Sequence, residues 1–483
     1  MSIPASIENY QEELINALQD CLRIKSISGK KEGTLQALDY FLNLGKKLGF
    51  KAANISNLGG IIEFGEGQKT IGIIVHLDTV PEGQGWKFPP FAGHIQDDKI
   101  YGRGAIDDKG PAIAVLYALK AVKDAGIEPQ GKVQIIAGID EETVWHTTPQ
   151  LLQKIKEPDF SFVPDSKFPL VIAEKGLIWL EIKKDFSKSP QNNPTKQESR
   201  LVIKHLQGGG ESLNIVPDYC EAILEIKDND NNQSPADNLV RSIEGKLKKY
   251  LEQEKAANPE KAPQIELHKD GLKLKLSAHG KSAHAFNCQE GYNAVSCLIR
   301  FLSQLDINRE QKKFLATYNS KIGQEYYGES LGLMLEDELT GKLTQSPGYI
   351  LFNEKSVTLK VDIRFPADKK LAEVKPKVLS AYECFEGWLT IIDSLEALRF
   401  AEDEPHIKTL LKVYRDYTGD QEAQPLGMGG TTFAKAFQRA VAFGPTFPGM
   451  PKVEHQPDEY IEIEHLLKCT EIYAQAIKEL VTG

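Results

Sequence analysis

The sequence has few of the features that mark secreted or membrane proteins. Its 483 residues hold only six cysteines, and no two of them form a CxxC pair, which argues against a disulfide scaffold and against a four-cysteine structural zinc site. No apolar run approaches the length that spans a bilayer, and the first residues lack the basic and apolar regions of a secretory signal. We therefore expect a cytoplasmic protein with no membrane partner.

Excess positive charge is also absent. Lys and Arg total 58 against 68 Asp and Glu, which gives a formal net charge of −10. Nucleic acid is not an expected partner, because phosphate binding needs concentrated Lys and Arg. The sequence contains no Walker lysine motif, and its GRGAIDD segment lacks the third glycine of a dinucleotide-binding fingerprint. Nucleotide-binding proteins are therefore a poor match.

Hydrophobic periodicity predicts an α/β layered structure at both ends of the chain. Residues 71–77 and 133–139 are almost wholly apolar, which is typical of strands buried on both faces of a mixed central sheet. Helical spacing of apolar residues is found in 7–22, from Asp108 to about Ala125, and again after Glu404. Strands that alternate with flanking helices indicate an α/β domain.

The pattern changes in the middle of the chain. After Gly176 the expected strands alternate apolar and polar residues, which predicts a sheet with one thinly covered face. The polar stretch from Asp185 to Arg200 is typical of an exposed loop. We therefore predict one discontinuous α/β domain, residues 1–175 and 399–483, with an α+β domain of residues 176–398 inserted into it.

Acidic residues and histidines stand where several predicted strands end. In VHLDTVP, His76 closes a buried strand, and Asp78 is placed to reach its imidazole because residues i and i+2 of an extended chain face the same side. In YGRGAIDDKGP, Asp107 and Asp108 are adjacent like charges that a divalent cation would compensate. A surface His–Asp pair and a simple helix N-cap remain the alternatives.

Three more segments have the same character. AGIDEETVW holds Glu141 and Glu142, FVPDSKFPL holds Asp165, and FPGMPKVEHQPDEY holds His455. Each alone is also explained as a solvated turn or an exposed loop. Because ligands gather at the carboxyl edge of α/β sheets, the set together predicts a hydrolytic site for zinc, manganese or cobalt, with imidazole and carboxylate ligands and no thiolate.

These motifs, in this order from residue 76 to residue 455, resemble those of the M20 family of co-catalytic metallopeptidases. Within that family they look most similar to the long dipeptidases related to PepV of lactic acid bacteria. The resemblance implies a split catalytic domain with an inserted lid domain, and a metallo-dipeptidase that cleaves dipeptides or short peptides. It implies two Zn²⁺ per chain, with Mn²⁺ or Co²⁺ as alternatives. His76 and Asp165 would hold one ion and Glu142 and His455 the other, with Asp107 as the shared ligand.

The same resemblance assigns further roles. Glu141 corresponds to the general base, Asp78 to the residue that orients His76, and the Asp107–Asp108 bond to a cis peptide. In HGKSAHAF, His284 would stabilise the oxyanion of the reaction, with His279 as the competing candidate. The substrate's free carboxylate would be bound by Asn214 of LNIVPD, Arg364 of VDIRFP, and Gly429 and Gly430 of the GMGG turn, which we expect to open a helix.

Two other functions are consistent with the same motifs. An N-acyl amino acid deacylase of the acetylornithine or succinyl-diaminopimelate type would share the metal ligands but usually has a shorter lid. A non-catalytic peptide-binding relative should have lost the base or a ligand, whereas this chain keeps Glu141 and all five ligand positions. The length of the chain favours the dipeptidase, and by resemblance a monomer.

Overall fold

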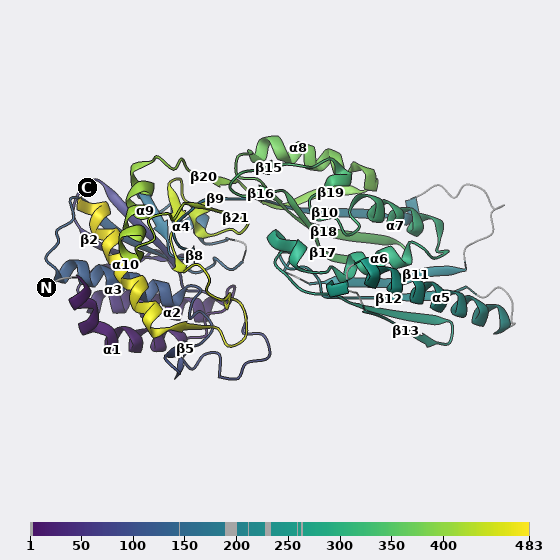
Figure 1. Cartoon of the computed structure of the whole chain (residues 1–483), viewed down its shortest axis with the longest axis horizontal. Helices are drawn as coiled ribbons and strands as arrows, with labels where there is room; N and C mark the ends of the chain where they lie inside the picture. Colours follow the sequence, from purple (N-terminus) through teal and green to yellow (C-terminus); the bar gives the residue numbers. More distant parts are fainter. Residues whose placement is uncertain are drawn as a thin grey trace. The chain divides into compact units, whose positions relative to one another are not determined.

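The computed structural model describes residues 3–143, 145–188, 200–210, 212–227, 233–257, 259–261 and 264–482. The chain divides into two compact units. The first unit consists of Met1–Ala173 together with Leu398–Gly483, and the second consists of Glu174–Ala397. Figure 1 shows the elements of both units in the colours of the sequence.

The first unit is built around a mixed β-sheet, as the sequence predicts. β3 is parallel to β6 and β7, and β22 is parallel to β7, whereas β2 is antiparallel to β6. The carboxyl ends of β3, β6, β7 and β22 therefore meet at one edge of the sheet. The strand order is β1 (Lys51–Asn54), β2 (Gly60–Gly65), β6 (Lys132–Gly138), β3 (Thr70–His76), β7 (Phe160–Val163), β22 (Ala440–Ala442), β9 (Val171–Glu174) and β20 (Leu398–Arg399), with β21 (Leu426–Met428) beside β9.

Helices cover this sheet because their sequences carry broad apolar faces. α3 (Lys109–Asp124) is buried along most of its length and packs against α1 (Ile3–Leu22) and α10 (Ile463–Thr482), as Figure 1 shows. The remaining helices of the unit are α2 (Lys31–Lys47), α4 (Thr148–Leu152) and α9 (Pro405–Thr418). Smaller sheets join β24 (Tyr460–Glu462), β5 (Lys99–Tyr101) and β4 (His94–Gln96), and β23 (Pro445–Thr446) with β8 (Ser166–Lys167).

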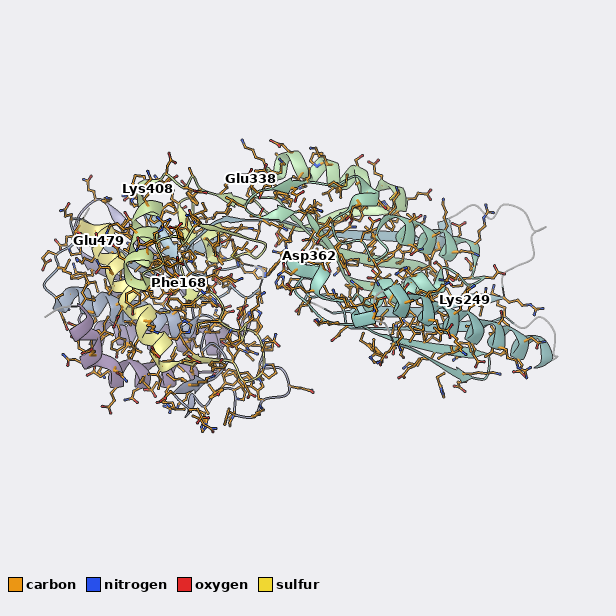
Figure 2. All side chains as sticks on the ribbon, viewed as in Figure 1. Phe168, Lys249, Glu338, Asp362, Lys408 and Glu479 are labelled. Atoms are coloured by element: carbon orange, nitrogen blue, oxygen red, sulfur yellow. The ribbon has the colours of Figure 1, made fainter. Side chains whose placement is uncertain are left out.

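An aromatic cluster joins the C-terminal helices to the sheet. The ring of Phe168, labelled in Figure 2, lies 5.0 Å from that of Phe443 and 5.5 Å from that of Tyr414 on α9. Tyr473 on α10 is 6.1 Å from Phe168. Because large buried rings contribute strongly to core stability, the two separate stretches of the first unit share one core.

The second unit is an antiparallel sheet with helices. β12 alternates buried and less buried residues, so this sheet has the predicted one-sided burial. Its core draws on Leu224 of β12, Leu298 of α6 (Ala294–Leu302), Phe314 of α7 (Arg309–Lys321) and Val378 of α8 (Leu371–Tyr382). A further helix of this unit is α5 (Gln233–Ala257). The strand order is β13 (Gln264–Asp270), β14 (Lys273–His279), β12 (Tyr219–Ile226), β11 (Leu201–Gly209), β17 (Thr344–Asn353), β18 (Ser356–Phe365), β10 (Gly176–Asp185) and β19 (Trp388–Leu395).

One predicted element is wrong. The helix expected after the GMGG turn is only a four-residue 3₁₀ segment, η6 (Phe433–Ala436). Phe433 and Phe437 both pack into the cluster around Ile74 and Ile136, and the chain then enters β22. The few residues between Phe437 and the start of β22 leave no room for a further helical turn.

Two other expectations concern exposed and apolar segments. Residues 189–199 of the predicted loop between Asp185 and Arg200 lie outside the described residues. In the part of the chain that the structure describes, no helix combines the length and apolar character needed to cross a bilayer.

Candidate metal centre

His76 is the last residue of β3, where the buried strand reaches the carboxyl edge of the sheet. Its Nδ1 atom lies 3.0 Å from the carbonyl oxygen of Asp78 and 3.5 Å from the Asp78 carboxylate. A carbonyl oxygen only accepts hydrogen bonds, so this contact places the proton on Nδ1. Nε2 is thereby left to face Asp107 Oδ1 at 3.0 Å and Asp165 Oδ2 at 3.7 Å.

Asp107 lies in the turn between β5 and α3, and the Asp107–Asp108 peptide is cis, as the family resemblance implies. Its two carboxylate oxygens have different partners. Oδ1 is 3.0 Å from His76 Nε2, and Oδ2 is 2.9 Å from His455 Nε2. One carboxylate with oxygens turned to two imidazoles has the geometry required to bridge two metal ions.

Two groups of side chains at this edge are close enough to hold an ion each. His76, Asp107 and Asp165 form one group, and Asp107, Glu142 and His455 form the other. In each group the candidate ligand atoms lie within 4.8 Å of one another. His455 Nε2 is 3.1 Å from Glu142, and His455 has a positive φ of 63°, which is uncommon outside glycine and frequent at functional sites.

Negative charge is concentrated at this edge. Burial raises the pKa of Glu141 and of Asp165 well above the usual carboxyl range, and the charge of Asp107 raises both further. Burial would lower the pKa of His76, but its contacts with Asp107 and Asp78 outweigh burial and raise it well above the ordinary value. Such a cluster stabilises positive charge, whether protons or a bound cation.

Asp78 organises the acidic turn that follows β6. Its carboxylate accepts the backbone N–H of Glu141 at 3.2 Å and that of Glu142 at 3.1 Å. Asp140 has a different task, because it accepts the Thr148 hydroxyl at 2.6 Å at the start of α4. Of the three consecutive acids, Glu141 and Glu142 are therefore the two available for chemistry.

Aromatic side chains pack behind the His76 ring. Phe433 makes an edge contact with His76, with centroids 6.1 Å apart, and another with Trp145 at 5.5 Å. Gly138, the last residue of β6, makes this packing possible, since a Cβ at that position would lie 2.2 Å from Phe433 Cε2. The imidazole is thus held by packing as well as by hydrogen bonds.

Three buried residues lie beside the site, and of these the sequence pattern indicates Asp108 only as the neighbour of Asp107, and does not single out Arg103 or Glu459. Asp108 accepts the backbone N–H of His76 at 3.0 Å. Glu459 is fully buried and pairs with Arg103, with Oε2 2.6 Å from Nη1. The available signal for Glu459 was its place in PDEY, directly before the strand that follows His455.

The residues predicted to bind the substrate lie in both units of the chain. Gly429 and Gly430 lie in the bend between β21 and η6 of the first unit. Asn214 and His284 are neighbours in the second unit, where the Ala285 N–H donates to the Asn214 carbonyl at 2.8 Å and Ile215 forms a bridge with His284.

Arg364 is a buried residue of β18 in the second unit. Its Nε and Nη2 donate to the two oxygens of Asp362 at 2.8 and 2.9 Å. Asp362, labelled in Figure 2, also accepts from Trp179 Nε1 at 2.8 Å. The guanidinium is therefore held in a fixed orientation by a bidentate contact.

The donor set of the candidate centre fits divalent metal ions. Imidazole nitrogen and carboxylate oxygen are ligands of zinc, manganese and cobalt, and neither group contains a thiolate. The shared Asp107 allows two ions rather than one. The arrangement is suited to a hydrolytic centre, because Glu141 belongs to neither ligand group and its carboxylate is not required to hold an ion.

Solved structures with a similar fold include two dipeptidases. Dug1p, a dipeptidase of Saccharomyces cerevisiae, gives a TM-score of 0.58 at 13% identity and covers 100% of this chain and 98% of its own. Aminoacylhistidine dipeptidase of Vibrio alginolyticus gives a TM-score of 0.54 at 16% identity, with 97% and 96% covered. At these identities the likeness shows the fold.

Two bacterial relatives carry the name "Putative dipeptidase". YtjP of Bacillus subtilis (strain 168) is 36% identical over 490 residues, covering 99% of this chain and 100% of the relative. A protein of Staphylococcus epidermidis is 30% identical over 483 residues, covering 98% and 97%. The family model "Peptidase family M20/M25/M40" matches residues 72–479. With the ordered motifs and the split α/β unit, this match shows that the chain belongs to the M20 peptidase family.

Proposed function

We propose that the chain is a metal-dependent dipeptidase that cleaves dipeptides or short peptides to amino acids. The observation that carries this proposal is the pair of ligand groups that share Asp107, with His76 and Asp165 on one side and Glu142 and His455 on the other. Zinc is the proposed ion, with manganese or cobalt as alternatives. When bound, the ions supply a Lewis acid that polarises the scissile carbonyl and favours ionisation of water.

The protein's own residues do the remaining work. Glu141 takes a proton from the attacking water and returns it to the leaving amine. Burial and neighbouring negative charge raise its pKa, which suits a carboxylate that must hold a proton between these two events. Asp78 keeps Glu141 and Glu142 in place through their backbone N–H groups and fixes His76 through Nδ1.

Residues of the second unit are proposed to recognise the substrate. We assign oxyanion stabilisation to His284 and binding of the free carboxylate to Asn214 and Arg364, with Gly429 and Gly430 of the first unit as further candidates. The bidentate contact with Asp362 fixes the orientation of the Arg364 guanidinium. Asn214→Ala should raise KM more than it lowers kcat, and an unchanged KM would remove Asn214 from the binding set.

The test compares three classes of compound on the zinc-loaded protein. Unmodified dipeptides, N-acetyl amino acids and N-succinyl amino acids are each offered, and release of free amino acid is measured. We expect hydrolysis of dipeptides. Exclusive release of amino acids from the acylated compounds would assign the chain as a deacylase, and binding of dipeptides without any hydrolysis would make it a peptide-binding relative.

Glu141→Gln tests the assigned base. A loss of kcat by roughly 10²- to 10⁴-fold is expected with metal content unchanged. The matched control is Glu66→Gln, since Glu66 is an exposed carboxylate whose ion pair with Lys51 spans 3.4 Å. Full hydrolysis by metal-loaded Glu141→Gln would exclude Glu141 as the base.

The ion, the oligomeric state and the compartment are separate parts of the proposal. Metal analysis of protein purified without added metal identifies the ion. We propose a monomer in the cytoplasm, and sedimentation of the purified chain tests the first of these.

A further inference from the structure

Glu459 is a fully buried carboxylate that belongs to neither group of candidate ligands. Its Oε1 atom accepts three backbone N–H groups, those of Gly104 at 3.1 Å, Ile106 at 3.0 Å and Asp107 at 3.3 Å. These residues form the irregular turn that carries Asp107 into the site. The turn is almost wholly buried, so these three N–H groups need an acceptor, and the Glu459 carboxylate supplies it.

The other oxygen of Glu459 fixes a second segment. Oε2 accepts Arg103 Nη1 at 2.6 Å, and Arg103 Nη2 donates to the carbonyl of Glu82 at 3.1 Å. The guanidinium also lies over the ring of Trp86, 5.2 Å from its centroid. Hydrogen bonds to a buried charge are strong and directional, so the turn has a rigid support.

Backbone contacts join the same two stretches of chain. The Gly102 N–H donates to the Glu459 carbonyl at 2.9 Å, and β24 pairs with β5 in the register Tyr460 to Tyr101. His455 stands four residues before Glu459. The position of His455 relative to Asp107 is therefore set where the two stretches meet, and Glu459 is the side chain at that junction.

We propose that Glu459 is a positioning residue that sets the spacing between Asp107 and His455, and thereby the affinity of the Asp107–Glu142–His455 group for its metal ion. The inference rests on the proposed two-metal function. It differs from a general stabilising role, because the two ions should be affected unequally. The Asp107–Glu142–His455 group depends on Glu459 for the placing of both Asp107 and His455, whereas the other group shares only Asp107 and has its remaining ligands, His76 and Asp165, at the ends of β3 and β7. Residues that hold metal ligands in place typically change metal affinity by about 10- to 100-fold when they are replaced.

The experiment is a metal titration of the full chain. Wild type, Glu459→Ala and the control Glu462→Gln are stripped of metal, checked for folding by urea unfolding, and titrated with Zn²⁺ against a fluorescent chelator. Glu462 is a suitable control because it lies on the same strand and its ion pair with Lys99 is long, at 3.4 Å, and partly exposed. Here the ion of the Asp107–Glu142–His455 group is called the second equivalent, and the ion of the other group the first. We expect Glu459→Ala to raise the dissociation constant of the second equivalent by about 10- to 100-fold, while that of the first stays within about threefold of the wild type.

The outcomes separate the alternatives. If folded Glu459→Ala binds both equivalents as the wild type does, or weakens both equally, the positioning role is wrong. If Glu459→Ala does not fold, Glu459→Gln decides, because it keeps an oxygen for the three N–H groups but loses the charge opposite Arg103. We expect the second equivalent of Glu459→Gln to bind roughly 3- to 10-fold more weakly, and unchanged binding would again overturn the inference.

A rescue variant distinguishes hydrogen bonding from charge. Arg103→Met with Glu459→Gln removes both buried charges and keeps the acceptor oxygen, so no unpaired charge remains. We expect it to restore the second equivalent to within about threefold of the wild type, and failure of this rescue would contradict the acceptor role. If the wild type itself binds fewer than two equivalents of Zn²⁺ per chain, the proposed two-metal function is wrong.

Discussion

The carboxylate of Asp78 accepts the backbone N–H of Glu142 at 3.1 Å. The sequence places Asp78 beside His76 and predicts contact with the imidazole. The structure adds a second task, since the same carboxylate also binds the turn that carries Glu141 and Glu142. Asp78 therefore connects the end of β3 to the end of β6.

Asp78→Asn tests this connection. Asn keeps one acceptor oxygen but loses the charge and the second acceptor, so the Glu141–Glu142 turn becomes less fixed. We expect kcat/KM for a dipeptide to fall about 10- to 100-fold in a protein that still folds. Steady-state kinetics at saturating zinc measure it, with Asp39→Asn on the exposed side of α2 as the control. If the variant is as active as the wild type, the Glu141–Glu142 turn keeps its conformation without the Asp78 carboxylate.

Metal removal should lower the stability of the protein. An ion that binds only the native state stabilises it by about 2.7 kcal/mol when its concentration is 100 times the dissociation constant. We expect the Tm of stripped protein to rise on addition of Zn²⁺, with two equivalents bound per chain. His455→Gln should keep one equivalent, because the group of His76, Asp107 and Asp165 remains whole. A Tm that does not respond to zinc would contradict the assigned ligands.

Gly138→Ala should disturb the packing behind His76. The added methyl would lie 2.2 Å from Phe433 Cε2, so the ring must move, and overpacking of this kind costs about 1–3 kcal/mol. Urea unfolding should show this loss together with lower peptidase activity. Gly245→Ala is the matched control, because Gly245 lies on an exposed face of α5 with nothing within 4 Å of a Cβ. That change should stabilise the chain by up to about 1 kcal/mol.

His465 gives a prediction for pH. Burial holds its pKa below the ordinary value although its Nε2 donates to the Pro445 carbonyl at 2.8 Å. The unfolded chain therefore takes up the proton first. The contribution of neutral His465 to stability is complete above the unfolded pKa of roughly 6.5, and it is lost as the pH falls from there towards the lower native pKa.

His465→Gln should reduce that acid sensitivity. The difference in unfolding free energy between pH 7.5 and pH 5.5 is expected to be smaller in this variant than in the wild type, by urea unfolding at both values. The exposed His146 provides the control, and His146→Gln should leave the difference unchanged. Equal pH dependence in His465→Gln and wild type would refute the prediction.

Three of the proposed ligands, His76, Glu142 and Asp165, lie at or within four residues of the ends of β3, β6 and β7, so the sequence alone could bring them to one edge of the sheet. The buried run before His76 and the run before Asp140 identify the edge of the sheet, and the acids follow directly. His455 is different, since its segment has no periodic pattern, and only its order among the motifs drew attention to it. The M20 membership that these motifs predict is confirmed by the family match.

The supporting residues were not predictable in the same way. Glu459 and Arg103 are charged residues that sequence patterns place on the surface, and burial of such a pair depends on contacts between segments more than 350 residues apart in the chain. The missing helix after Met428 has a similar cause. Its residues have adequate helical propensity, but packing of Phe433 and Phe437 against the sheet overrides it.

The second unit is inserted between two stretches of the first, and this insertion also sets the order in which the proposed ligands are synthesised. When residue 397 emerges, four of the five proposed ligands exist, but β22, α9 and α10 do not. The sheet at that stage lacks the strand between β7 and β9, and the turn with Asp107 lacks Glu459. A nascent chain therefore completes the inserted unit before the proposed metal centre, and the Asp107–Glu142–His455 group lacks His455 until the final tenth of translation has begun.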